Sequence, residues 1–190
     1  MLYLASGSPR RKELLENRGY KFIIEKADID ETMDPNLDAI QNVKNVSLKK
    51  ALKVFNNHPS DVVLACDTIV VLHDKIYGKP HDKEDAKRIL KELSGLTHEV
   101  ISGVAILSGE NRYVFCETSY VTFKELTDKE IDEYISTGEP MDKAGAYAIQ
   151  GIGRKLIERF SGNLENIIGL PIDRVDEILG KLLWCGKLVM

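Results

Sequence analysis

Short apolar runs alternate with segments of helical periodicity along the chain, and this alternation favours an α/β or α+β fold. The apolar runs predict strands at residues 2–5, 22–24, 62–66, 69–72, 76–77, 99–107 and 113–123. Apolar positions spaced three and four residues apart predict helices after residue 8, over residues 37–55, and within 82–95, 127–138 and 172–182.

Several predicted helices carry capping signals. Ser8 and Pro9 are typical of an N-cap followed by the first helical position, and Gly19 ends that helix. Thr127 and Glu130 have the spacing of a capping box, which satisfies two backbone N–H groups at a helix start. These signals place helix ends independently of the apolar pattern.

The glycine-rich segment 143–153 follows neither the strand period nor the helix period, so we predict a loop of defined shape there. The sequence contains no repeat and no long linker. We therefore predict one domain over residues 1–190, with room for two lobes around a cleft.

Composition and charge exclude several classes of protein. The chain has 190 residues, 43% of them hydrophobic, which is enough for a substantial core. Its 26 basic and 30 acidic residues give a net charge of -4, which argues against a nucleic-acid-binding module. The longest apolar stretch is too short to span a bilayer, so we expect no membrane segment. Three widely spaced cysteines suit a reducing cytoplasm and form neither a disulfide framework nor a zinc site, namely Cys66, Cys116 and Cys185.

Two arginines open the first predicted helix, where the helix dipole favours acidic residues instead. Arg10 and Arg11 become favourable if an anion such as a phosphate binds at this helix start, next to Ser6 and Ser8. The alternative is that both arginines are simply solvated behind a serine cap. The sequence leaves both interpretations open.

Asp67 interrupts a long apolar stretch, and a buried carboxylate is costly unless it is paired or binds a metal. Such exceptions concentrate at active sites, although Asp67 could also end a strand or hydrogen-bond to Thr68. The acidic segment 28–31, which includes Glu31, offers the oxygen ligands that Mg²⁺ or Mn²⁺ accepts, or else a solvated turn. Lys50 is not distinctive alone.

Two further residues have polar groups that suit a nucleotide. Lys79 stands between Gly78 and Pro80, which restrict the backbone around it. Gln150 offers a donor and an acceptor for the edge of a base, or it is a buried glutamine satisfied by backbone groups. Together, these cations, carboxylates and a base reader favour metal-assisted attack of water on a nucleotide polyphosphate.

Several blocks resemble the Maf family of nucleoside triphosphate pyrophosphatases. In chain order the sequence reads LASGSPRR at 4–11, DTIV at 67–70, GKP at 78–80, LSGLTH at 93–98, KAGAYAIQG at 143–151 and IGLP at 168–171. The resemblance implies an α/β fold: a mixed sheet with flanking helices and two lobes around a central cleft, similar to inosine triphosphate pyrophosphatases. It also implies hydrolysis of a nucleoside triphosphate to the monophosphate and pyrophosphate with a divalent cation, and it is compatible with a homodimer.

The resemblance assigns roles to individual residues. Asp67 matches the proton acceptor, and Arg10, Thr68 and Gln150 match positions that set substrate choice. Other polar cleft positions correspond to Ser6, Arg11, Glu31, Lys50 and Lys79. We expect phosphates to bind at the helix start from Ser8 to Arg11, helped by Lys50 and Lys79. We expect Glu31 and Asp67 to hold part of the coordination of a divalent ion.

The arginine pair resembles the subgroup that acts on dTTP and UTP, and the sequence does not rank these against modified nucleotides. The sequence departs from the usual family pattern at two places. These are Ala65 and Cys66, which come directly before Asp67, and the segment 162–166. The alternative function is a nucleotide-binding regulator of cell division in which hydrolysis is incidental. Binding alone needs no proton acceptor, so Asp67 favours the enzyme.

Overall fold

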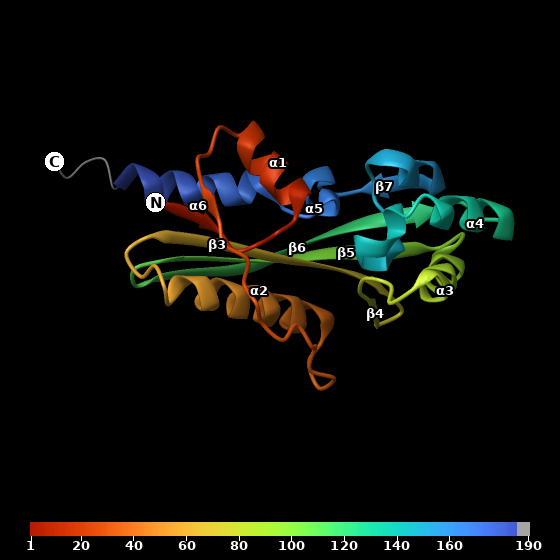
Figure 1. Cartoon of the computed structure of the whole chain (residues 1–190), viewed down its shortest axis with the longest axis horizontal. Coiled ribbons are helices and arrows are strands. Elements are labelled where there is room, and N and C mark those ends of the chain that lie inside the picture. The colour runs from red at the N-terminus through yellow and green to blue at the C-terminus, as the bar shows by residue number, and fades with distance from the viewer. Residues whose placement is uncertain (186–190) are drawn as a thin grey trace. The chain divides into compact units, whose positions relative to one another are not determined.

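The chain forms a mixed seven-stranded sheet with flanking helices, in a computed structural model that describes residues 1–185 (Figure 1). The strands are β1 (Leu2–Leu4), β2 (Ile23–Ile24), β3 (Val62–Leu72), β4 (Lys75–Tyr77), β5 (Thr97–Ser108), β6 (Asn111–Phe123) and β7 (Ile157–Ser161). The α-helices are α1 (Pro9–Asn17), α2 (Ala39–Phe55), α3 (Lys83–Leu93), α4 (Asp128–Ser136), α5 (Leu164–Ile168) and α6 (Ile172–Cys185), and the 3₁₀ helices are η1 (Glu139–Asp142), η2 (Ala144–Ala146) and η3 (Gly151–Leu156). The predicted α/β class is confirmed.

The strand order is β2-β1-β3-β5-β6-β7, with β4 paired to β3. Strand β1 runs parallel to both β2 and β3, whereas the pairs β3–β4 and β6–β7 are antiparallel. Parallel neighbours need a crossover connection, which α1 and α2 provide.

The chain divides into two compact units, each assembled from separate segments. Unit 1 comprises Met1–Asp67, Ser102–Glu117 and the described residues from Gly169 onward, and unit 2 comprises Thr68–Ile101 and Thr118–Ile168. Strands β3, β5 and β6 contribute residues to both units. The boundary in β3 falls between Asp67 and Thr68, two of the predicted site residues.

In unit 1, alternate residues of β1 and β3 enter two different cores. Leu2, Leu4 and Leu64 pack with α1 and α6, on one side of the strands. Val63 and Ala65 pack with Ala51 and Val54 of α2. Figure 1 shows α2 on the opposite side of these strands from α1 and α6. A period of two residues is what a strand covered on both faces requires.

Helix α2 lies unusually close to the sheet. A Cβ atom on Gly103 of β5 would stand 2.4 Å from the backbone oxygen of Val43, so only glycine permits this approach. The helix starts two residues later than predicted, because Asp38 and Gln41 form a capping box. This placement of α2 fixes the position of Lys50, further along the helix.

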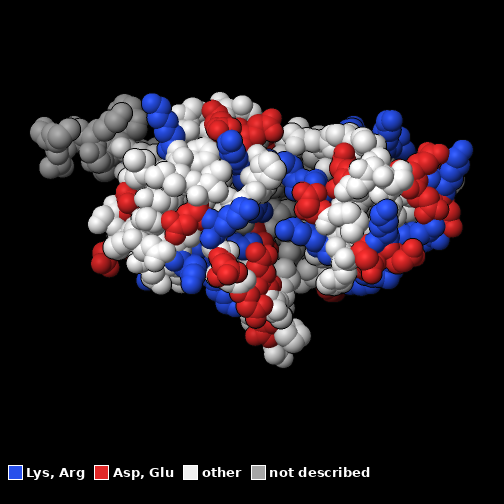
Figure 2. Space-filling model, in the orientation of Figure 1, with Lys and Arg blue, Asp and Glu red and all other residues white. Residues whose placement is uncertain are grey.

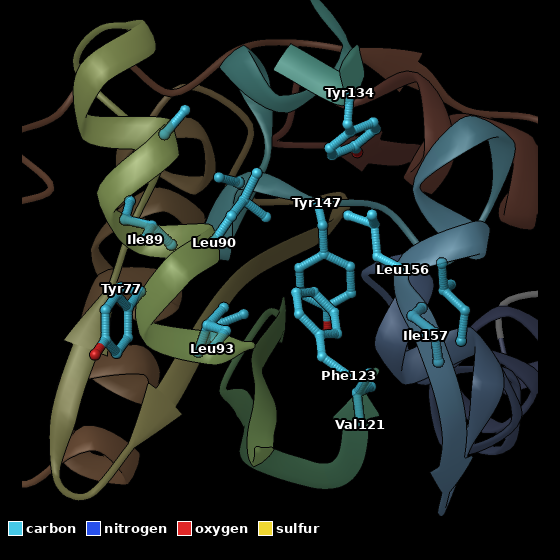
Figure 3. Packing of buried hydrophobic residues seen from close by; sticks show 14 of the residues in the cluster. Tyr77, Ile89, Leu90, Leu93, Val121, Phe123, Tyr134, Tyr147, Leu156 and Ile157 are labelled. Carbon is cyan, nitrogen blue, oxygen red and sulfur yellow. The ribbon is translucent and has the colours of Figure 1, made fainter. Parts of the chain in front are cut away.

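Unit 2 has one core, built between α3, α4 and the sheet. Phe123 and Tyr147 stack edge to face at its centre with ring centroids 4.7 Å apart, and Leu90 and Leu93 of α3 pack nearby (Figure 3). The predicted capping box of Thr127 and Glu130 is present at the start of α4.

The structure corrects the prediction of separate strands at 62–66 and 69–72. Strand β3 is continuous from Val62 to Leu72, so Asp67 lies inside it. The prediction also missed β7 and α5, which are five residues long each and carry too few apolar positions to show a period. Neither Cys66 nor Cys116 forms a disulfide among the described residues, and the side chain of Cys185 lies outside that part.

None of the helices in residues 1–185 is long and apolar enough to cross a membrane.

Candidate functional site

Most predicted site residues of unit 1 come after the carboxyl ends of β1 and β2, while Lys50 lies in α2 and Asp67 lies inside β3. The pairing of β1 continues past the strand, since Ala5 N donates to Leu64 O at 2.8 Å. After β2, Glu25 N donates to Leu4 O at 3.1 Å and the chain enters the acidic loop. Ligands of open α/β sheets bind beyond this end of the strands.

Arg11 is held in place by two contacts within unit 1. Its Nη1 donates to Ser6 Oγ at 3.0 Å, and its Nε donates to the carbonyl oxygen of Gly169 at 2.8 Å. Arg10 and Arg11 are half-buried, so neither side chain is fully solvated. Ser8 occupies the N-cap of α1 as predicted, but its side chain makes no capping hydrogen bond.

Gly169 has a role that the sequence did not reveal. Its carbonyl oxygen also accepts a hydrogen bond from Cys66 Sγ at 3.2 Å, so one backbone atom joins Arg11 to the residue before Asp67. Gly169 adopts φ +131°, a conformation that favours glycine. The only signal in the sequence was its place in the block at 168–171.

Asp67 is paired with Lys50 in the interior. Lys50 Nζ donates to Asp67 Oδ1 at 2.7 Å, and both residues are less than a tenth exposed. The same ammonium lies 3.0 Å from Glu31 Oε1 on the acidic loop. Because Asp67 is buried inside β3, the alternative role of ending a strand is wrong.

The acidic loop supplies one of its carboxylates to this cluster. Hydrogen bonds from the Thr32 side chain and from its backbone N, the latter 2.9 Å from Asp30 Oδ1, hold the pKa of Asp30 below its ordinary value. Glu31 contacts Lys50. Figure 2 shows acidic side chains gathered along the loop that leads into α2.

These carboxylates can hold a divalent cation only if phosphate oxygens of a bound substrate complete its coordination. No group of three or more His, Cys, Asp or Glu side chains in the described chain could hold an ion. Glu31 and Asp67 lie against one ammonium, and Mg²⁺ commonly binds one or two carboxylates together with substrate phosphates. The donor set matches that second kind of site.

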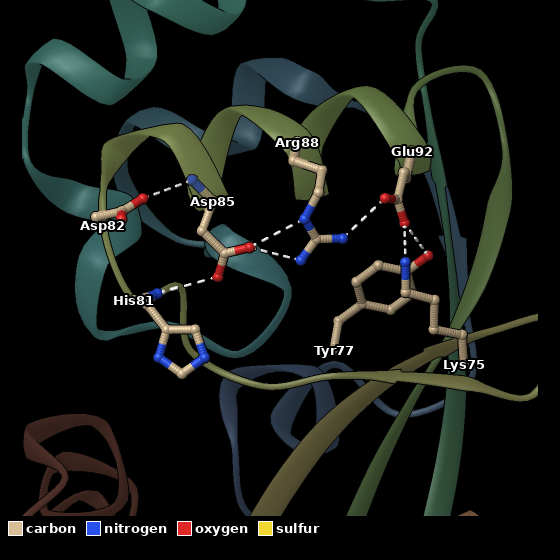
Figure 4. Close-up of polar contacts among 7 residues, drawn as sticks. All are labelled: Lys75, Tyr77, His81, Asp82, Asp85, Arg88 and Glu92. Carbon is tan, nitrogen blue, oxygen red and sulfur yellow. Dashed lines mark hydrogen bonds and ion pairs between the residues drawn. The ribbon is translucent and has the colours of Figure 1, made fainter.

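In unit 2, the turn that carries Lys79 is fastened to α3 on both sides (Figure 4). Before the turn, Tyr77 Oη donates to Glu92 Oε2 at 2.6 Å. After it, the backbone N of His81 donates to Asp85 Oδ2 at 3.1 Å. Lys79 itself is exposed between these two attachments.

Arg88 connects the two carboxylates that hold this turn. Its Nη1 donates to Glu92 Oε1 at 2.8 Å and its Nε donates to Asp85 Oδ1 at 3.1 Å. Hydrogen bonds from Lys75 and Tyr77 lower the pKa of Glu92 to about 2, and burial together with Glu92 raises the pKa of Tyr77 to about 12. The i, i+3 and i, i+4 spacing along α3 was the available sequence signal.

The glycine-rich segment packs against the same turn. Gly145 N donates to Gly78 O at 3.0 Å, and a Cβ on Gly145 would stand 2.7 Å from Cγ2 of Val70. Gln150, later in the segment, is exposed, which excludes the alternative of a buried glutamine. Thr68 is half-buried in β3.

Among the ten predicted residues, contacts join Arg11 to Ser6. Contacts also join Lys50 to both Glu31 and Asp67. Unit 1 contains Ser6, Ser8, Arg10, Arg11, Glu31, Lys50 and Asp67, and unit 2 contains Thr68, Lys79 and Gln150.

Comparisons with known proteins show what the chain is similar to. Residues 1–182 match the family model described as "Maf-like protein". A dTTP/UTP pyrophosphatase of Desulfitobacterium hafniense is 47% identical over 188 residues, covering 94% of this chain and 84% of the relative. One from Acholeplasma laidlawii is 45% identical over 180 residues, covering 94% of this chain and 95% of the relative. The solved structure of a HAM1 protein from Coxiella burnetii aligns with TM-score 0.54 and 13% identity, covering 95% of this chain and 98% of that one, which shows a shared fold.

Proposed function

This chain belongs to the family of Maf-like proteins, and on that premise we propose that it hydrolyses dTTP and UTP to the monophosphate and pyrophosphate. The observation that carries the proposal is the buried pair of Asp67 and Lys50 beside Glu31, since a nucleotide-binding protein without catalysis needs no carboxylate of this kind. Uncharged hydrogen-bonding residues would suffice for binding.

Asp67 acts as the proton acceptor. Lys50 occupies Oδ1, so we assign Oδ2 to the attacking water. The water oxygen forms a bond to the α-phosphorus, the bond from that phosphorus to the oxygen bridging to the β-phosphorus breaks, and pyrophosphate leaves. The proton of the water passes to Asp67, as general base catalysis requires.

The cations of unit 1 stabilise the negative charge of the triphosphate. Arg11 is already oriented by Ser6 and Gly169, so no rearrangement of its guanidinium accompanies binding. The start of α1 adds backbone N–H groups at Ser8 and beyond, with no acidic residue in its first turn. We assign the triphosphate to these groups.

Glu31 and Asp67 are the residues that would hold Mg²⁺ or Mn²⁺. When bound, the ion neutralises charge on the phosphate oxygens and polarises the reacting phosphorus. Chelation of divalent ions should abolish turnover, and added Mg²⁺ or Mn²⁺ should restore it.

Arg10, Thr68 and Gln150 set the choice of nucleotide. The amide of Gln150 can donate to a carbonyl oxygen and accept from the N–H of uracil or thymine, and both bases present these groups on one edge.

Because the sequence has three widely spaced cysteines and no pattern of a disulfide framework, we also propose that the reaction takes place in the cytoplasm.

Product analysis with a panel of nucleoside triphosphates tests the proposal. Wild type should release monophosphate and pyrophosphate from dTTP and UTP with Mg²⁺ or Mn²⁺, and Asp67→Asn should lower turnover by roughly 100- to 10,000-fold. Asp132→Asn, at an exposed aspartate paired with Lys87, is the matched control and should retain activity. Saturable nucleotide binding without turnover in wild type would favour a regulator and contradict the enzyme.

A further inference from the structure

Glu139 of η1 holds the backbone that immediately follows Gln150. The N–H of Ile152 donates to Glu139 Oε2 at 3.0 Å, and the N–H of Gly153 donates to Oε1 at 2.8 Å. Tyr134 of α4 donates its hydroxyl to the same Oε1 at 2.9 Å. One carboxylate thus joins η1, α4 and the start of η3, all within unit 2.

Two glycines permit this close contact. A Cβ on Gly151, which has φ +73°, would stand 2.7 Å from Glu139 Oε2. A Cβ on Gly153 would stand 2.6 Å from the hydroxyl oxygen of Tyr134 and 2.5 Å from Ala148 O. The glycine positions are therefore needed for the carboxylate to reach the backbone, and loop 151–153 can shift only by losing these bonds.

The residues before Gln150 are anchored as well. Ile149 and Tyr147 are buried in the core of unit 2, as Figure 3 shows for Tyr147, and the Tyr147 hydroxyl lies 2.8 Å from His98 Nε2. Gln150 is thus an exposed residue between two fixed segments.

The charge of Glu139 strengthens its hold on the loop. Burial alone would raise the pKa of Glu139, but the N–H groups of Gly153 and Ile152 and the Tyr134 hydroxyl outweigh it and keep the pKa below its ordinary value. The carboxylate is ionised at neutral pH, and hydrogen bonds to a charged acceptor are about twice as strong as neutral ones.

We propose that Glu139 is a positioning residue for base selection, which fixes loop 151–153 and thereby sets where Gln150 meets the base. This inference rests on the proposed function, because it needs Gln150 to read a pyrimidine. Glu139 itself touches the loop, and its effect on substrate choice passes through Gln150.

Glu139→Gln is the test variant, since an amide replaces one acceptor oxygen by an NH₂ group that faces a backbone N–H. Glu130→Gln is the matched control, because Glu130 Oε2 also accepts a backbone N–H, from Thr127 at 2.8 Å, at the far end of α4. The measurement is kcat/KM for dTTP and UTP relative to CTP and GTP, in each variant and in each combined with Gln150→Ala.

Glu139→Gln should reduce the preference for dTTP and UTP by roughly 10-fold or more, the scale expected from misplacing a contact group. The same substitution should change nothing further in the Gln150→Ala background. Glu130→Gln should leave the preference unchanged. Hydrogen exchange of the amides at 152 and 153 should quicken in Glu139→Gln alone.

Retained preference despite faster exchange would overturn the proposal, and so would an equal loss of preference with or without Gln150. Dissociation constants of the same nucleotides in the Asp67→Asn background separate this proposal from the proposed function. A wild type without turnover contradicts the pyrophosphatase, whereas the ratio of dissociation constants still decides the role of Glu139.

Discussion

The ammonium of Lys50 and the carboxylate of Asp67 form a 2.7 Å hydrogen bond in the interior of unit 1. The two residues come from different elements, α2 and β3, and α2 reaches the sheet closely only because Gly103 has no side chain. A buried charge is tolerated when a partner compensates it. Burial of both charges is costly, and we attribute their presence to catalysis.

Lys50→Met should destabilise the protein by about 3–5 kcal/mol, because it leaves the carboxylate of Asp67 buried without its partner. Combining it with Asp67→Asn removes the uncompensated charge and should restore much of that loss. Urea unfolding of the single and double variants measures both effects.

Lys87→Met is the matched control for this prediction, since Lys87 pairs with Asp132 on the surface. It should change the free energy of unfolding by less than about 1 kcal/mol. Equal losses in the free energy of unfolding in Lys50→Met and Lys87→Met would show that removing Lys50 from the buried pair costs no more than breaking a surface ion pair.

Arg11→Lys should reduce kcat/KM by roughly 10- to 100-fold, because lysine has no planar fork to contact Ser6 and Gly169 at once. Steady-state kinetics with dTTP and UTP measure the effect. Arg18→Lys alters an exposed arginine paired with Asp173, and it should leave kcat/KM within about twofold. Wild-type kinetics in Arg11→Lys would contradict a phosphate-binding role.

The sequence predicted those parts of the fold that depend on local pattern. The helix start at Asp128 was found because Thr127 and Glu130 satisfy backbone groups beside them. The start at Pro9 was found because proline suits the first helical position. Strand β7 was missed because four of its five residues are exposed, so its place depends on pairing with β6 and not on its own apolar pattern.

The candidate site shows the same limit. Asp67 was expected to interrupt a strand, because the compensating Lys50 lies 17 residues away in the sequence and only the tertiary fold joins them. Gly169 acts through a backbone oxygen, which no side-chain pattern encodes. Residue types suggested the chemistry, but their pairing required the structure.

Gly145→Ala should destabilise the protein by about 2–4 kcal/mol, since it combines a strained φ of +68° with a Cβ only 2.7 Å from Val70. It should also raise KM, because Gly145 N supports the Lys79 turn through Gly78 O. Thermal unfolding and steady-state kinetics report the two effects.

Gly138→Ala is the control for Gly145→Ala, because it introduces backbone strain at a positive φ without a steric contact of the added Cβ. Gly138 has φ +76°, and a Cβ there would meet no atom within 4 Å. It should cost about 1 kcal/mol and leave KM unchanged. If the two alanine variants behaved alike, the close packing of Gly145 on Val70 would contribute nothing.

His98 should make the stability of the protein depend on pH between 6.5 and about 4. Burial lowers the pKa of His98 from 6.5 to about 4, and its Nδ1 has no hydrogen-bond partner among the described residues to stabilise a second proton. Between pH 6.5 and about 4, the imidazole of His98 binds a proton in the unfolded chain but not in the folded protein. The free energy of unfolding should therefore fall as pH falls, by roughly 3 kcal/mol in all by pH 4.

His98→Gln tests this origin of the pH dependence, because glutamine can still hydrogen-bond to the Tyr147 hydroxyl but does not titrate. Urea unfolding at several pH values should show a stability difference between wild type and variant that shrinks as the pH falls toward 4. His73→Gln, at an exposed histidine in the turn after β3, should leave the slope of wild type unchanged. A constant difference between wild type and His98→Gln over this range would mean that the buried imidazole is protonated in the folded protein, and that the core around Phe123 and Tyr147 accommodates its charge.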